Sequence, residues 1–111
     1  MDEPRMTMAT LKVLGVLLSD PIGEHYGLEI AKRAGLASGS LYPILARLEE
    51  AGWITGAWEQ IDPVAAGRRP RRYYTLTANG AQHGWRALDE ARQALQPTLH
   101  PQLIPGGEAP A

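Results

Sequence analysis

The fold is decided by the stretch Ala31–Ile54, which reads AKRAGLASGSLYPILARLEEAGWI. A short helix ends in it at Gly35, because glycine readily adopts the left-handed conformation common just after a helix. Leucines at positions 41, 45 and 48 then recur at the spacing of one helix face, and Gly52 follows them. Two short helices joined by a tight turn are typical of a helix-turn-helix unit.

The residues before the turn predict two helices. Met6–Leu18 forms the first, since Leu11, Leu14 and Leu18 fall on one face, and a proline and a glycine follow it. Tyr26–Ala34 forms the second helix of the chain. Its apolar positions are Leu28, Ile30 and Ala31.

The third helix is expected to begin near Ser38 or Ser40, either of which can cap it, and to run to about Ala51. Pro43 lies within this helix, where proline removes a hydrogen bond and clashes with the preceding turn. Its place near the helix start, with Gly39 four residues earlier, makes it compatible with the helix.

A β-hairpin is predicted after the third helix. Trp53–Glu59 and Arg71–Leu76 read as strands, rich in aromatic and β-branched residues, and Ile61–Pro70 reads as the loop between them. The hairpin would carry a long, basic tip. The order helix, helix, turn, helix, strand, basic loop, strand is that of a winged helix-turn-helix domain, mainly α-helical with one small hairpin.

A fourth helix follows, capped by Thr77 and running over Ala78–Leu95. We expect a winged helix DNA-binding domain at 1–76, a dimerisation helix at 77–96 and a disordered tail at 97–111, which is rich in proline and glycine. The apolar stripe of the fourth helix packs either on the chain's own first helix or on a second copy, and we favour the second copy. Arg92 interrupts this stripe, whose members are Ala81, Trp85, Leu88 and Leu95.

Charge is concentrated in the middle of the chain. The formal net charge is only −1, so the basic footprint of a nucleic-acid binder has to be local. From position 32 to position 72 there are seven basic and four acidic residues, and the remainder holds four basic and eight acidic ones. The four acids of the middle segment are Glu49, Glu50, Glu59 and Asp62, and its bases are Lys32, Arg33, Arg47, Arg68, Arg69, Arg71 and Arg72.

Several classes of function are disfavoured. The chain has no cysteine, which excludes disulfides and thiolate metal sites. His25, His83 and His100 have no metal-like spacing, and no catalytic acid–base pair, nucleophile elbow or phosphate-binding glycine pattern is present, so no enzyme activity, metal or cofactor is expected. The longest apolar stretch, Val13–Leu18, is too short to span a bilayer, and a signal peptide is not apparent, which indicates a cytoplasmic protein.

The exposed face of the third helix is the predicted base-reading surface, because the second helix of such a motif enters the major groove of DNA. Leu41, Ile44, Leu45 and Leu48 would anchor the helix to the core. Tyr42 is either a surface aromatic or a phosphate contact, and the two serines serve as caps or contacts. The predicted DNA-contacting residues of this helix are Ser38, Gly39, Ser40, Tyr42, Pro43 and Arg47.

Arginines at the hairpin tip are the strongest electrostatic feature. Arg68, Arg69, Arg71 and Arg72 lie within five positions and are expected to contact DNA phosphates or enter the minor groove. Lys32 and Arg33 either contact the DNA backbone or form a solvated face. The alternative function is a winged helix used for protein–protein assembly. A ligand-responsive sensor is a variant of the DNA-binding regulator.

Four strings together resemble the PadR-like family of transcriptional regulators: Tyr26–Ile30, Ser38–Pro43, Leu45–Gly52, and Gly67–Thr77 with its Arg-Arg-Tyr-Tyr-Thr-Leu-Thr ending. The resemblance covers about Thr7 to Leu95. It implies a homodimer formed by the last helix with help from the first, through Leu11 and Leu14, and repression at an inverted repeat of double-stranded DNA. It also implies release by small aromatic or drug-like molecules, for which Trp85 is either a ligand contact or a packing residue. This chain has a shorter segment between its second and third helices, and a shorter C-terminal region, than many members.

Overall fold

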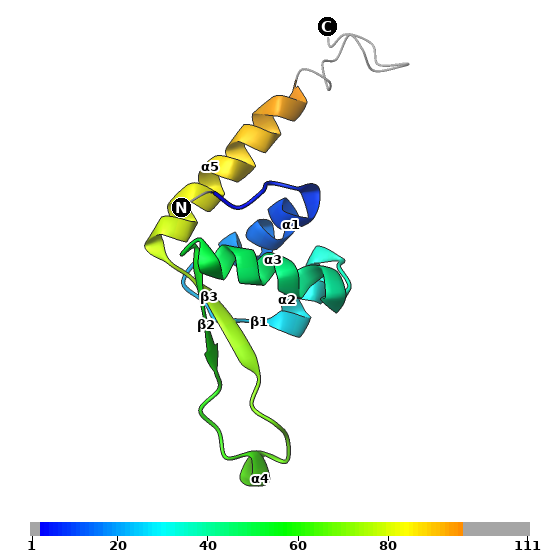
Figure 1. Ribbon diagram of the computed structural model, residues 1–111, viewed down its shortest axis with the longest axis vertical. Coiled ribbons are helices and arrows are strands. Elements are labelled where there is room, and N and C mark those ends of the chain that lie inside the picture. The colour runs from blue at the N-terminus through cyan, green and yellow to red at the C-terminus, as the bar shows by residue number, and fades with distance from the viewer. Residues whose placement is uncertain (1–2, 97–111) are drawn as a thin grey trace, which may run out of the picture.

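The computed structural model describes residues 3–96. The predicted fold class is confirmed: helices dominate, and a small antiparallel sheet extends from one end of them (Figure 1). The elements in chain order are α1 (Met8–Leu18), β1 (His25–Tyr26), α2 (Gly27–Ala34), α3 (Ser38–Glu50), β2 (Ile54–Trp58), α4 (Pro63–Ala66), β3 (Arg72–Leu76) and α5 (Ala78–Leu95). No helix within these described residues is long and apolar enough to cross a membrane.

The hairpin belongs to a three-stranded sheet in the order β1-β3-β2. β2 and β3 pair antiparallel from Ile54 opposite Leu76 to Trp58 opposite Arg72. The first strand was not predicted, because its two residues are too few to show an alternating pattern. It pairs Tyr26 with Tyr73 and so ties the start of α2 to the base of the hairpin.

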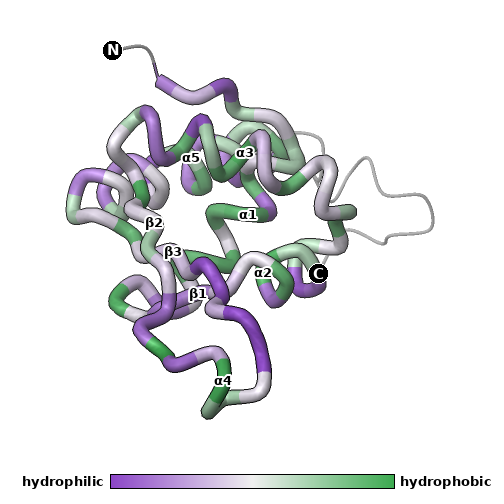
Figure 2. The backbone as a smooth tube through the Cα atoms, turned by 60° about the horizontal axis from the view of Figure 1, so that its bottom comes forward, coloured by the Kyte–Doolittle hydropathy of each residue, from purple (hydrophilic) through white to green (hydrophobic). Residues whose placement is uncertain are grey.

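The core lies between α1, α2 and α3, and the helix phases predicted from the sequence are confirmed there. Leu41, Ile44, Leu45 and Leu48 of α3 are all buried. They meet Val13, Leu14 and Leu17 of α1 and Ile30 of α2 in one cluster of buried side chains. Figure 2 shows hydrophobic stretches along these helices and a strongly hydrophilic segment between α4 and β3.

Three local predictions were wrong. Leu28 is 72% exposed, because it lies on the outer face of α2. Neither serine caps α3. Ala37 is the cap residue in extended conformation, and its carbonyl oxygen accepts from the backbone N–H groups of Ser40 and Leu41, both at 3.0 Å.

The third difference lies in the hairpin loop, which contains the short helix α4. The Asp62 carboxylate accepts from the Val64 N–H at 3.0 Å and so caps this helix. Gly67 ends it with φ at +69°. The predicted disordered tail at 97–111 lies outside the described residues.

α5 begins as predicted, with the Thr77 hydroxyl accepting from the Gly80 N–H at 2.9 Å. The same hydroxyl donates to the Gly52 carbonyl at 2.6 Å, so the cap also attaches α5 to the end of α3. Gly80 and Gly84 are buried, since their missing side chains let the first turns of α5 approach their neighbours closely. Gly80 lies against the Trp53 carbonyl, and Gly84 faces Leu18 of α1.

Gly80→Ala is expected to destabilise the domain, because its Cβ would overlap the Trp53 carbonyl oxygen, a backbone atom that cannot rotate away. Overpacking of this kind costs about 1–3 kcal/mol. The control is Gly15→Ala within α1, whose Cβ would meet nothing within 4 Å and which should gain about 0.5–1 kcal/mol of helix propensity. Urea unfolding measures both, and equal midpoints for the two variants would contradict the described packing.

Candidate nucleic-acid interface

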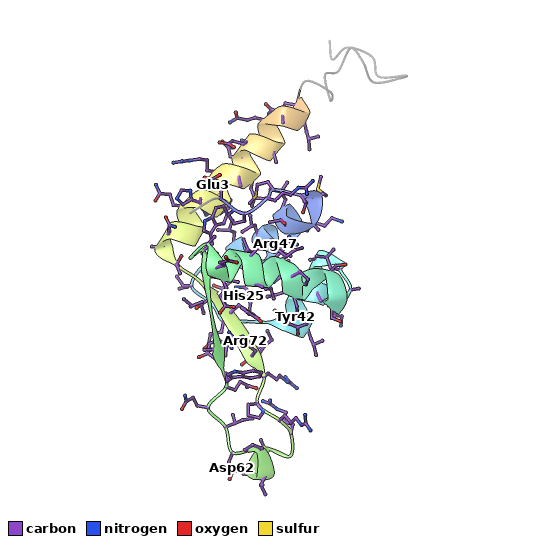
Figure 3. The ribbon with its side chains drawn as sticks, viewed as in Figure 1. Glu3, His25, Tyr42, Arg47, Asp62 and Arg72 are labelled. Carbon is purple, nitrogen blue, oxygen red and sulfur yellow. The ribbon has the colours of Figure 1, made fainter. Side chains whose placement is uncertain are left out.

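α3 turns one polar face to solvent. Its four buried apolar residues hold the helix to the core, and every residue of the predicted reading face is exposed. Figure 3 shows Tyr42 and Arg47 at different points along this helix. The exposed residues are Ser38, Gly39, Ser40, Tyr42, Pro43 and Arg47.

Tyr42 reaches from α3 to the start of α2. A Cβ built on Gly27 would lie 2.6 Å from the Tyr42 hydroxyl oxygen, so the glycine leaves room for the phenol ring. Tyr42 as a residue is 43% exposed, so part of its side chain is accessible from solvent. Tyr42 therefore joins the exposed face of α3 to the N-terminus of α2.

Glu59 organises the hairpin loop. Its carboxylate accepts two bonds from the Arg68 guanidinium, at 2.7 and 3.1 Å, and one from the Arg71 backbone N–H at 2.8 Å. The Arg68 hydrogen bond is the main reason that the pKa of Glu59 falls from 4.5 to about 2, assisted by the Arg71 N–H and opposed by burial. The Glu59 side chain therefore links the end of β2 to the loop and to the residue before β3.

Arg72 is likewise held by the protein. Its guanidinium donates to Glu49 of α3 at 3.0 Å and lies 5.5 Å from the Trp58 ring centroid and 5.7 Å from that of Tyr74. Gly56 of β2, which lies opposite Tyr74, has no side chain, and a Cβ there would lie 2.6 Å from the Arg72 Nη2 atom. Arg72 thus connects the loop end of the paired strands β2 and β3 to α3.

The four arginines of the hairpin therefore divide into two pairs. Arg68 and Arg72 are partly buried and bonded to carboxylates of the chain itself. Arg69 and Arg71 are exposed, and within residues 3–96 neither guanidinium has a carboxylate within ion-pair distance. The sequence predicted DNA contact for the cluster of four, and the structure gives two of its members carboxylate partners within the described chain.

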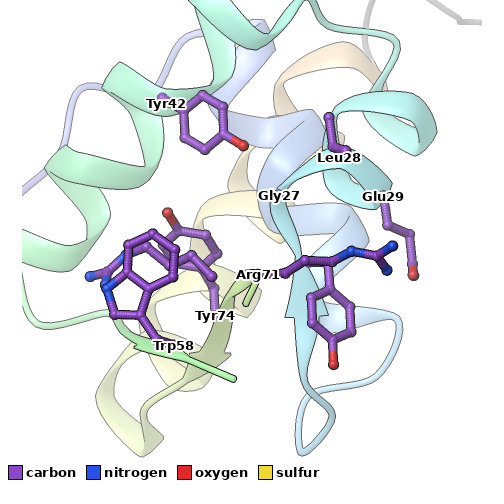
Figure 4. Close-up of a pocket in the computed structure, with 9 residues that line it drawn as sticks. Gly27, Leu28, Glu29, Tyr42, Trp58, Arg71 and Tyr74 are labelled. Carbon is purple, nitrogen blue, oxygen red and sulfur yellow. The ribbon is translucent and has the colours of Figure 1, made fainter. Parts of the chain in front are cut away.

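The hairpin and α3 share one side of the molecule. Tyr42, Arg71 and Arg72 line the same cavity of about 540 Å³, together with residues at the start of α2 and the aromatic rings of the sheet (Figure 4). Lys32 and Arg33 do not line it, although both are exposed on the last turn of α2. Arg33 donates to the Ser19 hydroxyl at 3.1 Å, which holds it over the loop after α1.

Sequence reasoning missed Glu59, Trp58, Tyr26 and Gly27 as parts of this surface. Glu59 was counted only as an acid that offsets the basic segment. The sequence did hold a signal for its role. Glu59 ends the first predicted strand of the hairpin, where its carboxylate can pair with the arginines across the hairpin. The roles of Tyr26 and Gly27 depend on β1, which has no sequence pattern.

Glu59→Gln should loosen the loop. Because the pKa of the folded carboxylate lies below its ordinary value, its stabilising effect is complete above about pH 4.5 and is lost as the pH falls toward 2. The amide replacement should remove this acid-dependent loss and speed hydrogen exchange of the Arg71 N–H several-fold at neutral pH. Glu50→Gln, at an exposed site on α3, is the control. Unchanged exchange in Glu59→Gln would show that the carboxylate does not hold the loop.

The predicted dimerisation residues lie on α5 and α1, and the structure contradicts the prediction for one residue of α1. Trp85 and Leu95 are 56% and 52% exposed, and Ala81 and Leu88 pack partly against the core. Leu14 was predicted to assist the dimer from the first helix, but it is fully buried inside the domain and cannot face a second copy. Leu11 is half-buried, and Arg92 is exposed and pairs with Asp89 at 2.9 Å.

The histidines serve local packing. The His25 ring Nε2 lies 2.9 Å from the Asp20 carbonyl oxygen, so the nitrogen donates to it. His83 stacks on Trp53 with ring centroids 5.5 Å apart. His100 lies outside the described residues. In the described part of the chain, no three His, Asp or Glu side chains are grouped to hold a metal ion.

A three-helix core with a helix-turn-helix, followed by a wing of β2, α4 and β3, defines the winged helix class of transcriptional regulators. Solved structures share this fold. The transcriptional regulator homologue from Pyrococcus horikoshii has a TM-score of 0.64 at 21% identity, covering 80% of this chain and 81% of that one. The circadian clock associated protein Pex from Anabaena has a TM-score of 0.59 at 26% identity, covering 84% and 82%. NadR, solved in complex with 4-hydroxyphenylacetate, has a TM-score of 0.60 at 25% identity, covering 85% and 63%.

The family is established by its sequence model. The model of the transcriptional regulator PadR-like family matches residues 13–84, which is most of the described chain. The chain belongs to this family, and it is a DNA-binding transcriptional regulator and not an enzyme. A search of curated proteins gave no match.

Proposed function

We propose that the chain acts as a homodimer that represses transcription by binding an inverted repeat in double-stranded DNA. The observation that carries this proposal is the shared surface of α3 and the wing, since Tyr42 and Arg71 line one cavity from two elements. A duplex presents a major groove beside a phosphate ridge, which matches a polar helix face beside a cationic loop. Such a regulator acts in the cytoplasm, where it reaches the DNA.

Each group of residues has a distinct part in this binding. The exposed face of α3, from Ser38 to Arg47, enters the major groove. Arg69 and Arg71 contact phosphates, because both residues are exposed and no carboxylate of residues 3–96 lies within ion-pair distance of either guanidinium. Arg68 and Arg72 position the wing through Glu59 and Glu49 and are not themselves principal DNA contacts. Lys32 and Arg33, on the last turn of α2, add weaker contacts to the DNA backbone.

Salt dependence tests DNA binding against the alternative of a protein-assembly module. Affinity for a pool of random duplexes, followed by fluorescence anisotropy, should fall steeply between about 50 and 200 mM salt, with a slope near −0.9 per phosphate contacted. A flat response, or no binding at low salt, would favour the protein-assembly module. That alternative depends on the acidic partners that a cationic wing would also attract.

The dimer is proposed to form through α5, where Trp85 presents a large apolar side chain to solvent. Trp85→Ala should raise the dimer dissociation constant about 30-fold or more, because a buried interface tryptophan commonly contributes at least about 2 kcal/mol. Sedimentation velocity over a concentration series measures it. The control is Trp58→Ala in the wing, since Trp58 is 59% exposed and Trp85 56%. An equal effect of both variants, or a wild-type monomer at micromolar concentration, would contradict the proposed interface.

Regulation by a small molecule is a variant of this function. NadR was solved with 4-hydroxyphenylacetate, so a similar fold accommodates an aromatic acid in that protein. If α5 forms the dimer, Trp85 is placed to line an effector site between the two copies. Ligand screening against the purified dimer with a Trp85→Leu control tests this variant.

A further inference from the structure

We infer that Pro43 is a residue that determines base specificity, because its ring packs against the methyl group of a thymine base in the major groove. Pro43 lies inside α3 and is exposed to solvent. This role rests on the proposed function, in which the exposed face of α3 enters the groove. It assigns a chemical preference to one position of each half-site of the operator.

The fold has no need of a proline at this position. A proline inside a helix has no N–H to donate to the carbonyl four residues earlier, and its ring crowds that turn, so it costs helix stability. The hydrophobic core of the described residues does not include Pro43. Gly39, four residues earlier, eases the crowding, yet a Cβ built on Gly39 would meet nothing within 4 Å. Two residues that weaken the helix therefore occupy its exposed face without a packing reason.

Pro43 lies on the midline of that face. Gly39, Pro43 and Ala46 are spaced four and three residues apart, so they lie one above the other along the helix. All three are exposed, and the leucines of α3 are buried on the opposite side. The midline is the part of α3 furthest from the core and therefore the part that reaches deepest into a groove. None of its three residues has a side-chain hydrogen-bond donor or acceptor.

The hydrogen-bonding side chains stand at the edges of the same face. Ser40 and Arg47 are seven residues apart and share one edge. Tyr42 lies on the other edge, where it reaches the start of α2 beside Gly27. These side chains are directed to the walls of the groove, whereas the midline presents hydrocarbon to its floor.

The two ends of α3 determine which turns approach the duplex most closely. Glu50 is exposed in the last turn, and its carboxylate repels DNA phosphates. The start of the helix carries the positive end of the helix dipole, which attracts a phosphate. α3 therefore enters the groove with its first turns foremost. Pro43 lies in the second turn, within the part that enters.

Thymine is the base that suits a hydrocarbon surface. In the major groove the edges of adenine, guanine and cytosine present hydrogen-bond donors and acceptors, and thymine adds a methyl group. A proline ring over a donor or acceptor would remove water from it and offer no bond in return. Against a thymine methyl, the same ring buries apolar surface on both sides. Pro43 therefore favours thymine and disfavours cytosine at the position that it covers.

The test removes the methyl group alone. Duplexes are enriched from a random pool with the full chain, and the enriched sequence is resynthesised with deoxyuridine in place of each thymidine in turn. Uracil pairs as thymine does and differs from it only by the missing methyl group. Fluorescence anisotropy should show one position in each half-site where uracil weakens binding about fourfold, the value expected for one buried methyl group.

Pro43→Ser identifies the residue that senses the methyl group. This variant should bind the thymine and uracil duplexes with equal affinity, because a hydroxyl replaces the apolar ring. Loss of a proline from a helix interior does not threaten the fold, which circular dichroism checks. Tyr42→Phe is the matched control in the same helix. It should weaken binding to both duplexes alike and keep the wild-type preference for thymine, since Tyr42 lies at the edge of the face.

The outcomes separate this role from the proposed function. Equal binding of thymine and uracil duplexes by the wild type at every position would overturn the role of Pro43 and leave DNA binding intact. An unchanged preference for thymine in Pro43→Ser, or an enriched sequence whose half-sites lack thymine, would do the same. If the folded chain enriches no duplex at low salt, the proposed function fails and the role of Pro43 fails with it.

Discussion

Arg69→Ala combined with Arg71→Ala is expected to weaken binding to duplex DNA at least about tenfold at about 0.1 M salt. The same double variant should make the salt slope shallower by about two, because each lost phosphate contact removes close to one released counterion. The reason lies in the wing, where these two guanidinium groups are exposed and Arg68 and Arg72 are bonded to Glu59 and Glu49. Fluorescence anisotropy with random duplexes measures both quantities.

A matched control separates contact from net charge. Arg5→Ala combined with Arg86→Ala removes the same two charges from exposed sites before α1 and on α5. In Figure 1, α5 and the N-terminal segment lie away from the wing. The control should retain nearly the wild-type slope. If both double variants lose affinity equally, the wing is not a specific contact surface and only the overall charge matters.

Leu45→Asp is expected to unfold the domain. Leu45 is 1% exposed at the centre of the core formed by α1, α2 and α3, and the cavity left by a truncated leucine alone costs about 2–5 kcal/mol. An unpaired carboxylate adds a large desolvation cost to that loss. Because small domains are stable by only about 5–15 kcal/mol, the sum approaches or exceeds the stability available. Far-ultraviolet circular dichroism should show the loss of helix, and thermal scans should show no cooperative transition.

The neighbouring position supplies the control for helix phase. Ala46 is exposed on the same helix, so Ala46→Asp should leave the melting temperature within a few degrees of wild type. Leu45→Ala, which keeps the site apolar, should fold but melt lower. A folded Leu45→Asp variant beside a destabilised Ala46→Asp variant would show that the faces of α3 are assigned in reverse.

Long periodic elements were predictable from the sequence because their patterns are repeated several times. α5 was predicted with its observed bounds, since Thr77 marks its start and eighteen residues carry its pattern. α3 was placed within a residue or so by its leucines, which recur on one buried face. The predicted cap of α3 was wrong because local preference favours serine over alanine at a helix start, whereas the helix already begins at Ser38 and leaves Ala37 at the cap position.

The parts of the site that depend on long-range contacts were not predictable. Arg68 and Arg69 are neighbouring arginines that no sequence pattern distinguishes. Only Arg68 bonds to Glu59, which lies nine positions away across the loop. Leu14 belongs to the stripe of α1 that faces inward, and periodicity alone does not say whether that stripe meets the core or a second copy. The cavity depends on the two residues of β1, which bring the start of α2 to the wing.

Selection of bound duplexes from a random pool with the purified full chain tests the central claim most directly. The account predicts enrichment of an inverted repeat whose half-sites are centred about one helical turn, or a multiple of it, apart. The Arg69→Ala, Arg71→Ala double variant should recover the same sequence at lower yield, since phosphate contacts weaken binding to all sequences alike. Recovery of a pool indistinguishable from the input, at low salt and with a folded protein, would contradict the claim that α3 and the wing together bind DNA.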